Sequence, residues 1–329
     1  MAISVLMPYR DAGVTIDEAI ASTLADLGPR DELVAIDDRS RDDGPERVAA
    51  WARRDPRVAA VTPAPGGGIA AALAHACRVA RHPLLARMDA DDVTLPGRFS
   101  AQTAALEADP DLAVVGCRVE AFPSPTEGMG AYVAWQNGLV TKEEHALAVH
   151  VESPLCHPGT MMRREAIEAV GGYRDAPWPE DWDLWLRLHH AGFGLAKIPR
   201  VLLRWRRHEA TTTRTDPRCA PERLRAARAR YLAPSLADSV FGVWGAGQTG
   251  RRLARALAAE GAKASFFIDI DPRKIGRKAY EAPILDVASG LARGARLVVA
   301  VGDRGARDVV RARLAGQGRV EGRDYVCAA

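Results

Sequence analysis

Long apolar runs are missing from this chain of 329 residues, and none approaches the roughly 18 uninterrupted apolar residues that a membrane-spanning helix needs. The opening stretch, MAISVLMPYRDAG, carries a charge at Arg10 where the apolar part of an export signal would continue. The sequence therefore predicts neither a membrane span nor an export signal.

Closely spaced cysteine pairs are also lacking. The five cysteines are odd in number and widely separated, at Cys77, Cys117, Cys156, Cys219 and Cys327. Without a C-x-x-C pair, neither a disulfide framework nor a zinc knuckle is indicated. This cysteine usage fits a reducing cytoplasm.

An excess of one charge sign is the third absence. Lysine and arginine total 45 against 42 acidic residues, a net charge of +3, which does not predict nucleic-acid binding. The hydrophobic fraction of 47% and the charged fraction of 26% are those of an ordinary globular protein. The length favours two domains.

The first 115 residues alternate short apolar runs with longer amphipathic stretches. This alternation predicts parallel βαβ units, with strands at 3–7, 33–36, 58–61 and 84–88 and helices at 14–27, 43–54 and 69–81. Ligands in such sheets bind outside the carboxyl ends of the strands. The residues that follow each apolar run are therefore the first candidates for a site.

Acidic residues follow three of these runs. Asp11, the pair Asp37-Asp38 and the group Asp89-Ala90-Asp91-Asp92 should converge on one edge of the sheet. Carboxylates gathered in this way suit Mg²⁺ or Mn²⁺ held together with a diphosphate. The alternative is a solvated acidic turn in which Asp91 or Asp92 caps the next helix.

The section 116–206 is rich in proline and is predicted to form loops and short helices over the sheet edge. Within it, residues 180–191 form an amphipathic helix with an acidic first turn, in which Trp182 and Trp185 are predicted core residues. Arginine becomes dense from 204 to 230, and a domain boundary is expected near 232–238. We therefore predict domains at 1–235, including an arginine-rich linker helix from about 208, and 236–329.

The final segment contains a glycine fingerprint. Gly245, Gly247 and Gly250 form G-x-G-x-x-G between a predicted strand and a predicted helix, and Asp269 ends the next apolar run. This context predicts a small Rossmann-like α/β domain with a possible nucleotide site at these four residues. NAD(P) is one candidate ligand and a structural or assembly role is another, because no accompanying hydride-transfer residues can be singled out.

Six blocks in the first 210 residues together resemble family 2 glycosyltransferases of the GT-A fold. In chain order, they are LMPYRDAG, ELVAIDDRSRDD, ARMDADDVTLPGRFSAQ, HPGTMMRREAIEAVGGYRD, PEDWDLWLRLHHAG and RWRRHEATT. The resemblance implies transfer of a sugar from a nucleotide-diphosphate donor, usually with inversion and with a divalent metal, Mn²⁺ or Mg²⁺. A saccharide or lipid-linked acceptor in cell-surface polysaccharide synthesis would follow.

The resemblance also implies roles for single residues. Asp89 and Asp91 take the place of the D-x-D motif, for ribose and metal, and Asp181 takes that of the catalytic base, with Glu180 in support. His208 matches a histidine that in several relatives joins the metal or the diphosphate, and His157 falls in a block where its role varies. The remaining donor-binding candidates are Pro8, Tyr9, Asp11, Asp37, Asp38 and Arg87.

Other interpretations remain open at this stage. Glu180 and Asp181 could simply compensate the charge of a helix N-terminus. The arginine-rich stretch could be a solvated linker or could contact an anionic membrane surface. The chain could also be an NAD(P)-linked sugar-modifying oxidoreductase, or a non-catalytic nucleotide-sugar-binding protein that assembles partners.

Overall fold

A computed structural model describes residues 1–62, 66–207, 216–302 and 305–329. The chain divides into two compact units. The first holds residues 1–145, 154–176 and 180–215, and the second holds 146–153, 177–179 and 216–329. No described helix is long and apolar enough to cross a membrane.

An eight-stranded sheet forms the centre of the first unit, in the order β3-β2-β1-β4-β7-β6-β8-β5. The four strands β3, β2, β1 and β4 are parallel, whereas β7 runs antiparallel to both β4 and β6. The strands are β1 (Ile3–Tyr9), β2 (Glu32–Asp37), β3 (Val58–Val61), β4 (Leu84–Arg87), β5 (Val93–Thr94), β6 (Leu112–Phe122), β7 (Met161–Arg163) and β8 (Gly194–Arg206). The predicted parallel βαβ order is confirmed for β1 to β4.

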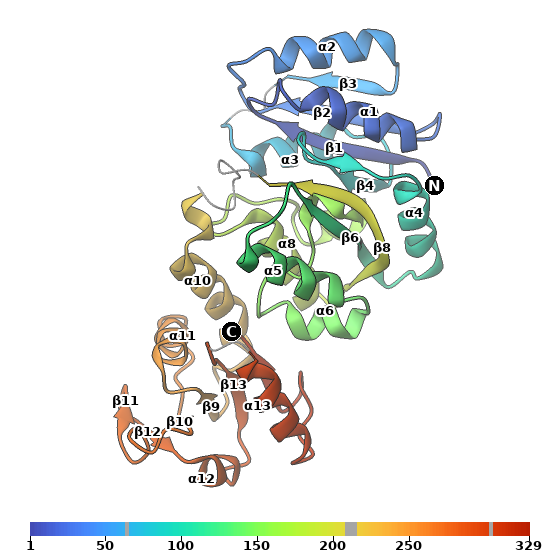
Figure 1. Cartoon of the computed structure of the whole chain (residues 1–329). Coiled ribbons are helices and arrows are strands. Elements are labelled where there is room, and N and C mark those ends of the chain that lie inside the picture. Colours follow the sequence, from blue (N-terminus) through green and yellow to red (C-terminus); the bar gives the residue numbers. More distant parts are fainter. Residues whose placement is uncertain (63–65, 208–215, 303–304) are drawn as a thin grey trace. The chain divides into compact units, whose positions relative to one another are not determined.

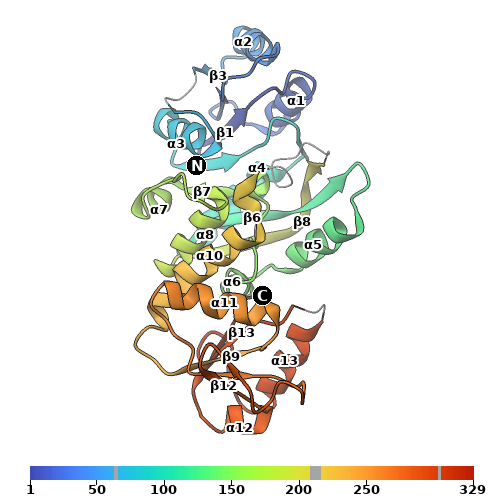
Figure 2. The same ribbon diagram turned by 90° about the vertical axis from the view of Figure 1, so that its left-hand side faces the viewer.

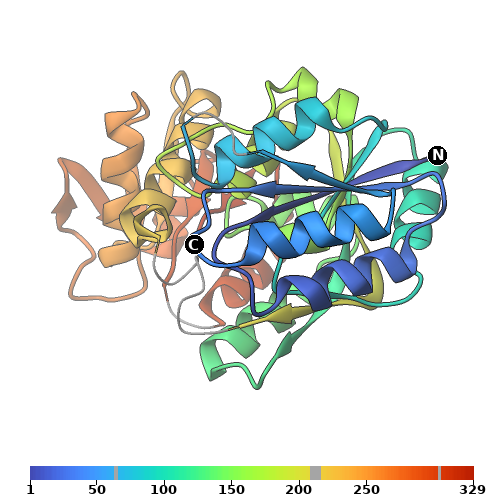
Figure 3. The ribbon, with the colours of Figure 1, turned by 90° about the horizontal axis from the view of Figure 1, so that it is seen from above.

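Helices cover both faces of the parallel strands. Figure 3 shows α1 and α2 on one face and α3 on the other, as expected when the crossover connections of a parallel sheet reverse direction. The helices of this region are α1 (Ile16–Asp26), α2 (Gly44–Arg54), α3 (Ile69–Val79), α4 (Arg98–Ala108), α5 (Glu127–Gly138), α6 (Lys142–Ala148), α7 (Arg164–Ala169) and α8 (Glu180–His190), with a short 3₁₀ turn at His157–Gly159.

The prediction of loops and short helices for 116–206 is wrong in one respect. This section contains most of β6 and all of β8, which pair in parallel along their length. Shifts in register near Leu112 and Arg118 interrupt the pairing, and Pro199 lies within β8. Such irregularities hide the two-residue period by which strands are recognised in a sequence.

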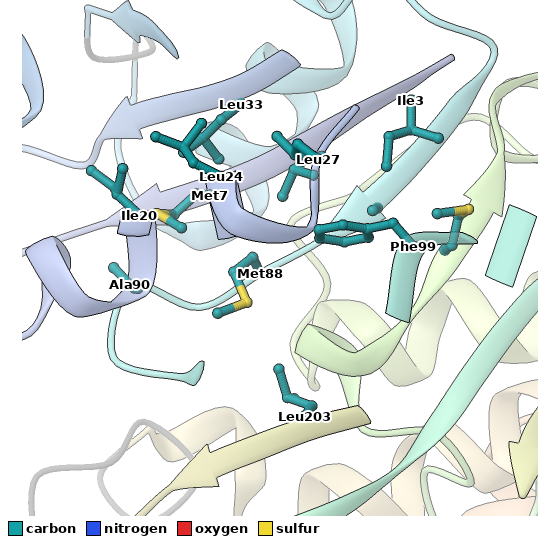
Figure 4. Packing of buried hydrophobic residues seen from close by; sticks show 14 of the residues in the cluster. Ile3, Met7, Ile20, Leu24, Leu27, Leu33, Met88, Ala90, Phe99 and Leu203 are labelled. Atoms are coloured by element: carbon teal, nitrogen blue, oxygen red, sulfur yellow. The ribbon is translucent and has the colours of Figure 1, made fainter. Parts of the chain in front are cut away.

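The hydrophobic core reaches the predicted site. Met88 and Ala90, on either side of Asp89, are buried in the same cluster as Ile20, Phe99 and Leu203 (Figure 4). The apolar neighbours of the acidic turn are thereby fixed by packing. Trp182 and Trp185 are also buried, which confirms their prediction as core residues.

The second unit contains a six-stranded sheet, β11-β12-β10-β9-β13-β14, that is parallel except for the β11–β12 pair. Helices α11 and α13 of this unit lie on opposite sides of the strands (Figure 1). Figure 2 shows the same strands from another side, with the short helix α12 also labelled. The elements are α10 (Pro221–Leu232), β9 (Phe241–Trp244), α11 (Gln248–Ala259), β10 (Phe266–Ile268), β11 (Lys278–Ala279), β12 (Ala282–Leu285), α12 (Val287–Leu291), β13 (Arg296–Val299), α13 (Ala306–Ala315) and β14 (Tyr325–Cys327), with 3₁₀ turns at Pro217–Cys219 and Ala233–Ser235.

Helix α10 belongs to the core of the second unit, whereas the sequence assigned it to the first domain as a linker. Ala229 and Leu232 of α10 are buried in one cluster with Phe241 and Val243 of β9. The guanidinium of Arg228 donates to the carbonyl of Val151 in the same unit. The compact division therefore falls near residue 216, earlier than the boundary expected from composition.

Candidate functional site

The ends of three parallel strands bring the predicted donor-binding residues together. Tyr9 of β1 lies opposite Asp37 of β2, and Leu6 of β1 lies opposite Arg87 at the end of β4. Pro8 is buried in β1, beside these ends. The carboxyl edge of β2, β1 and β4 therefore carries the candidate site, as the sequence predicted.

Asp37 and Asp38 shape the loops after β1 and β2. The Oδ1 atom of Asp37 accepts from the amide of Ser40 at 2.9 Å. The Oδ1 atom of Asp38 accepts from the amide of Gly68 at 2.7 Å, and the Asp38 amide donates to the carbonyl of Tyr9 at 2.7 Å. Backbone groups thus hold both carboxylates in place through Oδ1, and each carboxylate has further acceptor capacity at Oδ2.

Asp11 links the first-strand loop to the second-strand loop. It has a positive φ of 49°, and its Oδ1 accepts from the Arg41 amide at 2.7 Å while its own amide donates to the Ser40 hydroxyl at 3.0 Å. Aspartate tolerates this left-handed conformation better than most residues. Nearby, burial and the carboxylates, Asp37 first among them, raise the pKa of Tyr9, so its phenol stays neutral.

Asp89, Asp91 and Asp92 form a compact group of carboxylates. One oxygen from each lies within 4.8 Å of the other two. Asp92 is 1% exposed, and its Oδ1 accepts from the Arg206 amide at 2.7 Å. Its Oδ2 is buried and has no hydrogen-bond partner among the described residues.

The electrostatics of this group fit a divalent cation. Burial, followed by the charges of Asp89 and Asp91, raises the pKa of Asp92 well above its usual range. Like charges so close together oppose full ionisation unless a positive group lies between them. Mn²⁺ and Mg²⁺ prefer hard oxygen ligands such as these carboxylates. A bound cation would also give the buried Oδ2 atom of Asp92 a partner.

Arg87 supplies a fixed positive charge next to the acids. Its side chain is 1% exposed, and its Nη2 donates to Asp89 Oδ1 at 2.6 Å while Nη1 donates to the Met88 carbonyl. Burial alone would lower the pKa of Arg87, but Asp89, Tyr173 and Glu180 act against it and the pKa is raised on balance. The acids after β4 and the first turn of α8 thus share the electrostatic field of one guanidinium.

Glu180 and Asp181 begin α8, but their surroundings differ. Glu180 is 7% exposed, and its Oε1 lies 3.8 Å from Nδ1 of His157. The Nε2 atom of His157 lies 2.8 Å from the hydroxyl of Tyr173. Burial, and then the charge of Arg87, lowers the pKa of His157 well below its usual range, so this histidine is a neutral hydrogen-bonding group.

Asp181 is only half buried, and its charge contributes to the raised pKa of Tyr173. Tyr173 is therefore electrostatically coupled to Glu180, Asp181 and Arg87. The inward Glu180 fits a supporting role, whereas the more accessible Asp181 is the one of the pair that an acceptor could reach. His208 lies outside the described residues.

Arg98 has a structural part in the site that the sequence analysis did not predict. This buried guanidinium donates through Nη2 to the carbonyls of Arg87 and Pro158, each at 2.6 Å. It therefore ties the end of β4 to the turn that carries His157. The sequence signal for Arg98 is its place six residues after Asp92, in the stretch DADDVTLPGRFSAQ that resembles the family.

The glycine turn of the second unit has the close approaches that its fingerprint predicts. A Cβ on Gly250 would lie 1.8 Å from the carbonyl oxygen of Gly245, and a Cβ on Gly245, where φ is +117°, would lie 2.4 Å from the Ala300 carbonyl oxygen. Gly247 has no neighbour within 4 Å of such a Cβ. The turn thus needs glycine at two of its three fingerprint positions.

Asp269 is part of this turn and is 7% exposed. Its Oδ2 accepts from the Ala246 amide at 2.9 Å and from Lys274 Nζ at 3.1 Å, and its Oδ1 accepts from the Asp271 amide at 2.9 Å. Asp269 therefore anchors the glycine turn to the loop after β10.

A parallel-centred sheet with a D-x-D cluster at its strand ends defines the class of nucleotide-sugar transferases with the GT-A fold. The family model for Glycosyl transferase family 2 matches residues 4–171, and the chain belongs to this family. The match includes the strand-end acids and Arg98, and it ends before Asp181.

Relatives with known names support the same family. The amylovoran biosynthesis glycosyltransferase AmsE of Erwinia amylovora is 29% identical over 54% of this chain and 64% of its own length, just under two thirds. EpsE of Bacillus subtilis, also named as a glycosyltransferase, is 31% identical over 58% of this chain and 68% of its own length. A β-1,3-galactosyltransferase of Escherichia coli, which uses UDP-Gal and a GlcNAc-diphosphoundecaprenol acceptor by its name, is 26% identical over 64% of this chain and 76% of its own length.

Solved structures show the same fold. Residues 1–349 of TarS from S. aureus match with a TM-score of 0.55 and 14% identity, covering 78% of this chain and 71% of that one. The mannosyltransferase PcManGT of Pyrobaculum calidifontis, solved with GDP-Man and Mn²⁺, matches with a TM-score of 0.51 and 20% identity, covering 70% of this chain and 61% of that one.

Proposed function

We propose that this chain transfers a sugar from a nucleoside-diphosphate sugar to an acceptor hydroxyl, with inversion at the anomeric carbon and with bound Mn²⁺ or Mg²⁺. The observation that carries the proposal is the group formed by Asp89, Asp91 and Asp92, with its orphaned buried oxygen, at the sheet edge where the nucleoside-binding acids also converge. PcManGT was solved with Mn²⁺ and a nucleotide sugar, which supports the same ligand classes for this chain.

The donor would be held from two sides. Asp37 and Asp38, with Pro8, Tyr9 and Asp11, form the wall for the nucleoside. Asp89 and Asp91 would hold the cation, which supplies positive charge to the diphosphate when bound. Arg87 holds the Asp89 carboxylate in position through its 2.6 Å hydrogen bond.

Asp181 would accept the proton of the acceptor hydroxyl. As the hydroxyl oxygen forms its bond to the anomeric carbon, the bond from that carbon to the diphosphate oxygen breaks, and the nucleoside diphosphate leaves with the electron pair. The proton passes to the Asp181 carboxylate. Glu180 and His157 would act on this step indirectly, because the buried Glu180 carboxylate packs beside the neutral His157 imidazole at the first turn of α8, with 3.8 Å between Oε1 and Nδ1.

The acceptor is proposed from the relatives. Their names refer to amylovoran synthesis and to a diphosphoundecaprenol-linked acceptor. We therefore propose a saccharide or lipid-linked acceptor in the synthesis of a cell-surface polysaccharide, with the reaction in the cytoplasm.

Two arginines of α10, the helix in the arginine-rich segment that could contact a membrane, already have partners within the protein. Arg228 is engaged with backbone carbonyls, and Arg230 pairs with Glu260 at 3.2 Å. Fewer arginines are therefore available for a lipid surface than the composition suggests.

The proposal is tested by incubating the purified chain with a panel of nucleotide sugars and measuring the released nucleoside diphosphate. We expect release from one donor class in the presence of Mn²⁺ or Mg²⁺ and its loss in EDTA or in an Asp91→Asn variant. If no donor is turned over or bound with either metal, the proposal is wrong. An Asp111→Asn variant, altered on a loop at the far end of β6, is the matched control and should retain activity.

A further inference from the structure

A cationic cleft lies at the glycine turn of the second unit. It has a volume of about 470 Å³ and is open to solvent on one side. Its lining includes Gly247 at the start of α11, together with Arg251, Arg252, Arg255, Lys274 and Tyr280. No acidic residue lines it.

The arginines of the cleft lack compensating charges. Among the described residues, Arg251, Arg252 and Arg255 form no ion pair, although they follow one another along α11. The Nε atom of Arg251 is buried without a hydrogen-bond partner among these residues. Like charges four residues apart on a helix repel each other, so the arrangement favours a bound anion.

The start of α11 adds to the attraction for an anion. The first amide groups of a helix have no partners within the helix and point out from its N-terminus. Gly247 and Gln248, at the N-terminus of α11, line the cleft. Gly247 leaves the space before these amides open, because no atom lies within 4 Å of the position of its missing Cβ. Arginines and helix amides together provide the donors that a pair of phosphate groups requires.

Tyr280 supplies an aromatic surface on the other side of the cleft. It forms a two-residue turn with Glu281 between β11 and β12, and both residues have positive φ, 50° and 67°. Such turns normally use asparagine and glycine, so this pair is held in a strained conformation. The strained turn places the Tyr280 ring under the Arg255 guanidinium, 5.2 Å from ring centroid to Cζ.

We propose that this cleft is a second ligand site, which binds a nucleoside diphosphate independently of a metal. The two phosphates contact Arg251, Arg255 and the amides at the start of α11, and the nucleoside packs against Tyr280. The site does not suit a dinucleotide. Asp269, which would bind a ribose hydroxyl in that case, already accepts from Ala246, Lys274 and Asp271.

Calorimetric titration of the full chain in EDTA tests this site apart from the proposed metal-dependent donor site. We expect UDP, GDP or ADP to bind at least about tenfold more tightly than pyrophosphate, and more tightly than NADH. The double variant Arg251→Gln/Arg255→Gln should lose about a hundredfold in affinity, since each of the two charged hydrogen bonds contributes roughly tenfold. Arg313→Gln, which removes an exposed arginine of α13 in the same unit, should bind as the wild type does.

Two further measurements separate binding from folding and locate the ligand. Tyr280→Gly removes the ring but relieves the positive φ, so it should weaken nucleotide binding without lowering the melting temperature. Hydrogen exchange with the bound nucleotide should show protection at 246–255 and 274–280. Metal-dependent donor turnover should persist in the arginine double variant, and EDTA-resistant binding should persist in Asp91→Asn.

Four results would overturn the proposal. They are no nucleotide binding in EDTA, equal binding of pyrophosphate and nucleotide, tighter binding of NADH, and protection confined to residues around 89–92. None of them bears on donor turnover in Mn²⁺, so a failure of the proposed transferase activity is recognised separately.

Discussion

Arg87 and Asp89 are joined by a 2.6 Å hydrogen bond between a guanidinium that is almost wholly buried and a carboxylate at the edge of the site. The same guanidinium influences Tyr173 and lies within the field of Glu180. One buried cation thus connects the acids after β4 with the acidic first turn of α8. A change at Arg87 should therefore affect both the proposed donor site around Asp89 and the proposed acceptor site at the start of α8.

Replacing Arg87 should impair both the fold and the donor site. Arg87→Met removes the buried guanidinium and its hydrogen bond to the partly exposed Asp89, and loss of a charged hydrogen bond costs about 1.5–3 kcal/mol in the free energy of unfolding. Donor affinity in Mn²⁺ should fall as well, because Asp89 loses its orientation. Urea denaturation and donor titration measure the two effects, with the exposed Arg30→Met as control. Wild-type values for both in Arg87→Met would contradict the connection.

Removing the Tyr173 hydroxyl should reduce turnover more than donor binding. Tyr173→Phe takes away the partner that lies 2.8 Å from His157 Nε2, a loss of about 1 kcal/mol in stability. With His157 less restrained, the first turn of α8 should be positioned less well for the acceptor. We expect kcat to fall severalfold while the Kd for the donor stays within about twofold. A donor Kd that rises as much as kcat falls would show that Tyr173 acts on the donor instead.

Acid should destabilise the first unit through His145. Burial lowers the pKa of His145 to about 4, from about 6.5 in an unfolded chain, and its Nδ1 lies 2.8 Å from the Thr141 carbonyl. The unfolded chain therefore binds more protons between these values, and stability falls as the pH drops from 6.5 toward 4. Between pH 7 and pH 5, this shift in the pKa of His145 should lower the free energy of unfolding by about 2 kcal/mol.

A His145→Gln variant should show a correspondingly smaller loss of stability between pH 7 and pH 5 when unfolding is followed in urea. His75→Gln, on α3, serves as the matched control and should keep the wild-type dependence. If His145→Gln and the wild type lose the same free energy, the protonation of His145 does not contribute.

Replacing two glycines of the same turn by alanine should change the stability of the second unit to very different degrees. Gly250→Ala would place a Cβ 1.8 Å from the Gly245 carbonyl oxygen, so the backbone must shift and the second unit should lose several kcal/mol, on the order of the largest single-residue effects. Gly247→Ala meets no atom within 4 Å and should be tolerated. Limited proteolysis and thermal melting of the full chain distinguish the two, and equal melting temperatures would refute this account of the turn.

The sequence predicted the elements of β1 to β4 closely because their residues alternate with amphipathic helices, and each strand is short and uninterrupted. It failed for β6 and β8 because register shifts and Pro199 obscure their period. It also assigned α10 to the wrong neighbour, since the packing of Ala229 and Leu232 against β9 is a tertiary contact that no local pattern reveals.

Part of the candidate site could likewise be predicted from the sequence and part could not. The acids at the strand ends could be found because parallel strands place them at one edge by topology alone. The roles of Arg98 and His157 could not, because they arise where the end of β4, at Arg87, meets the turn that begins at His157, 70 positions further along the chain. Both side chains are buried and held by hydrogen bonds to distant parts of the chain. The local sequence does not show which polar side chains will be buried in this way.

Asp181→Asn tests the central claim most directly, with the exposed Asp175→Asn as its control. Donor affinity in Mn²⁺ and turnover with acceptor are measured on both variants and on the wild type. If Asp181 accepts the acceptor proton, kcat should fall by ~10²–10⁴-fold in Asp181→Asn while the donor Kd changes little, and Asp175→Asn should match the wild type. Full turnover in Asp181→Asn, or a loss explained entirely by weaker donor binding, would contradict the account.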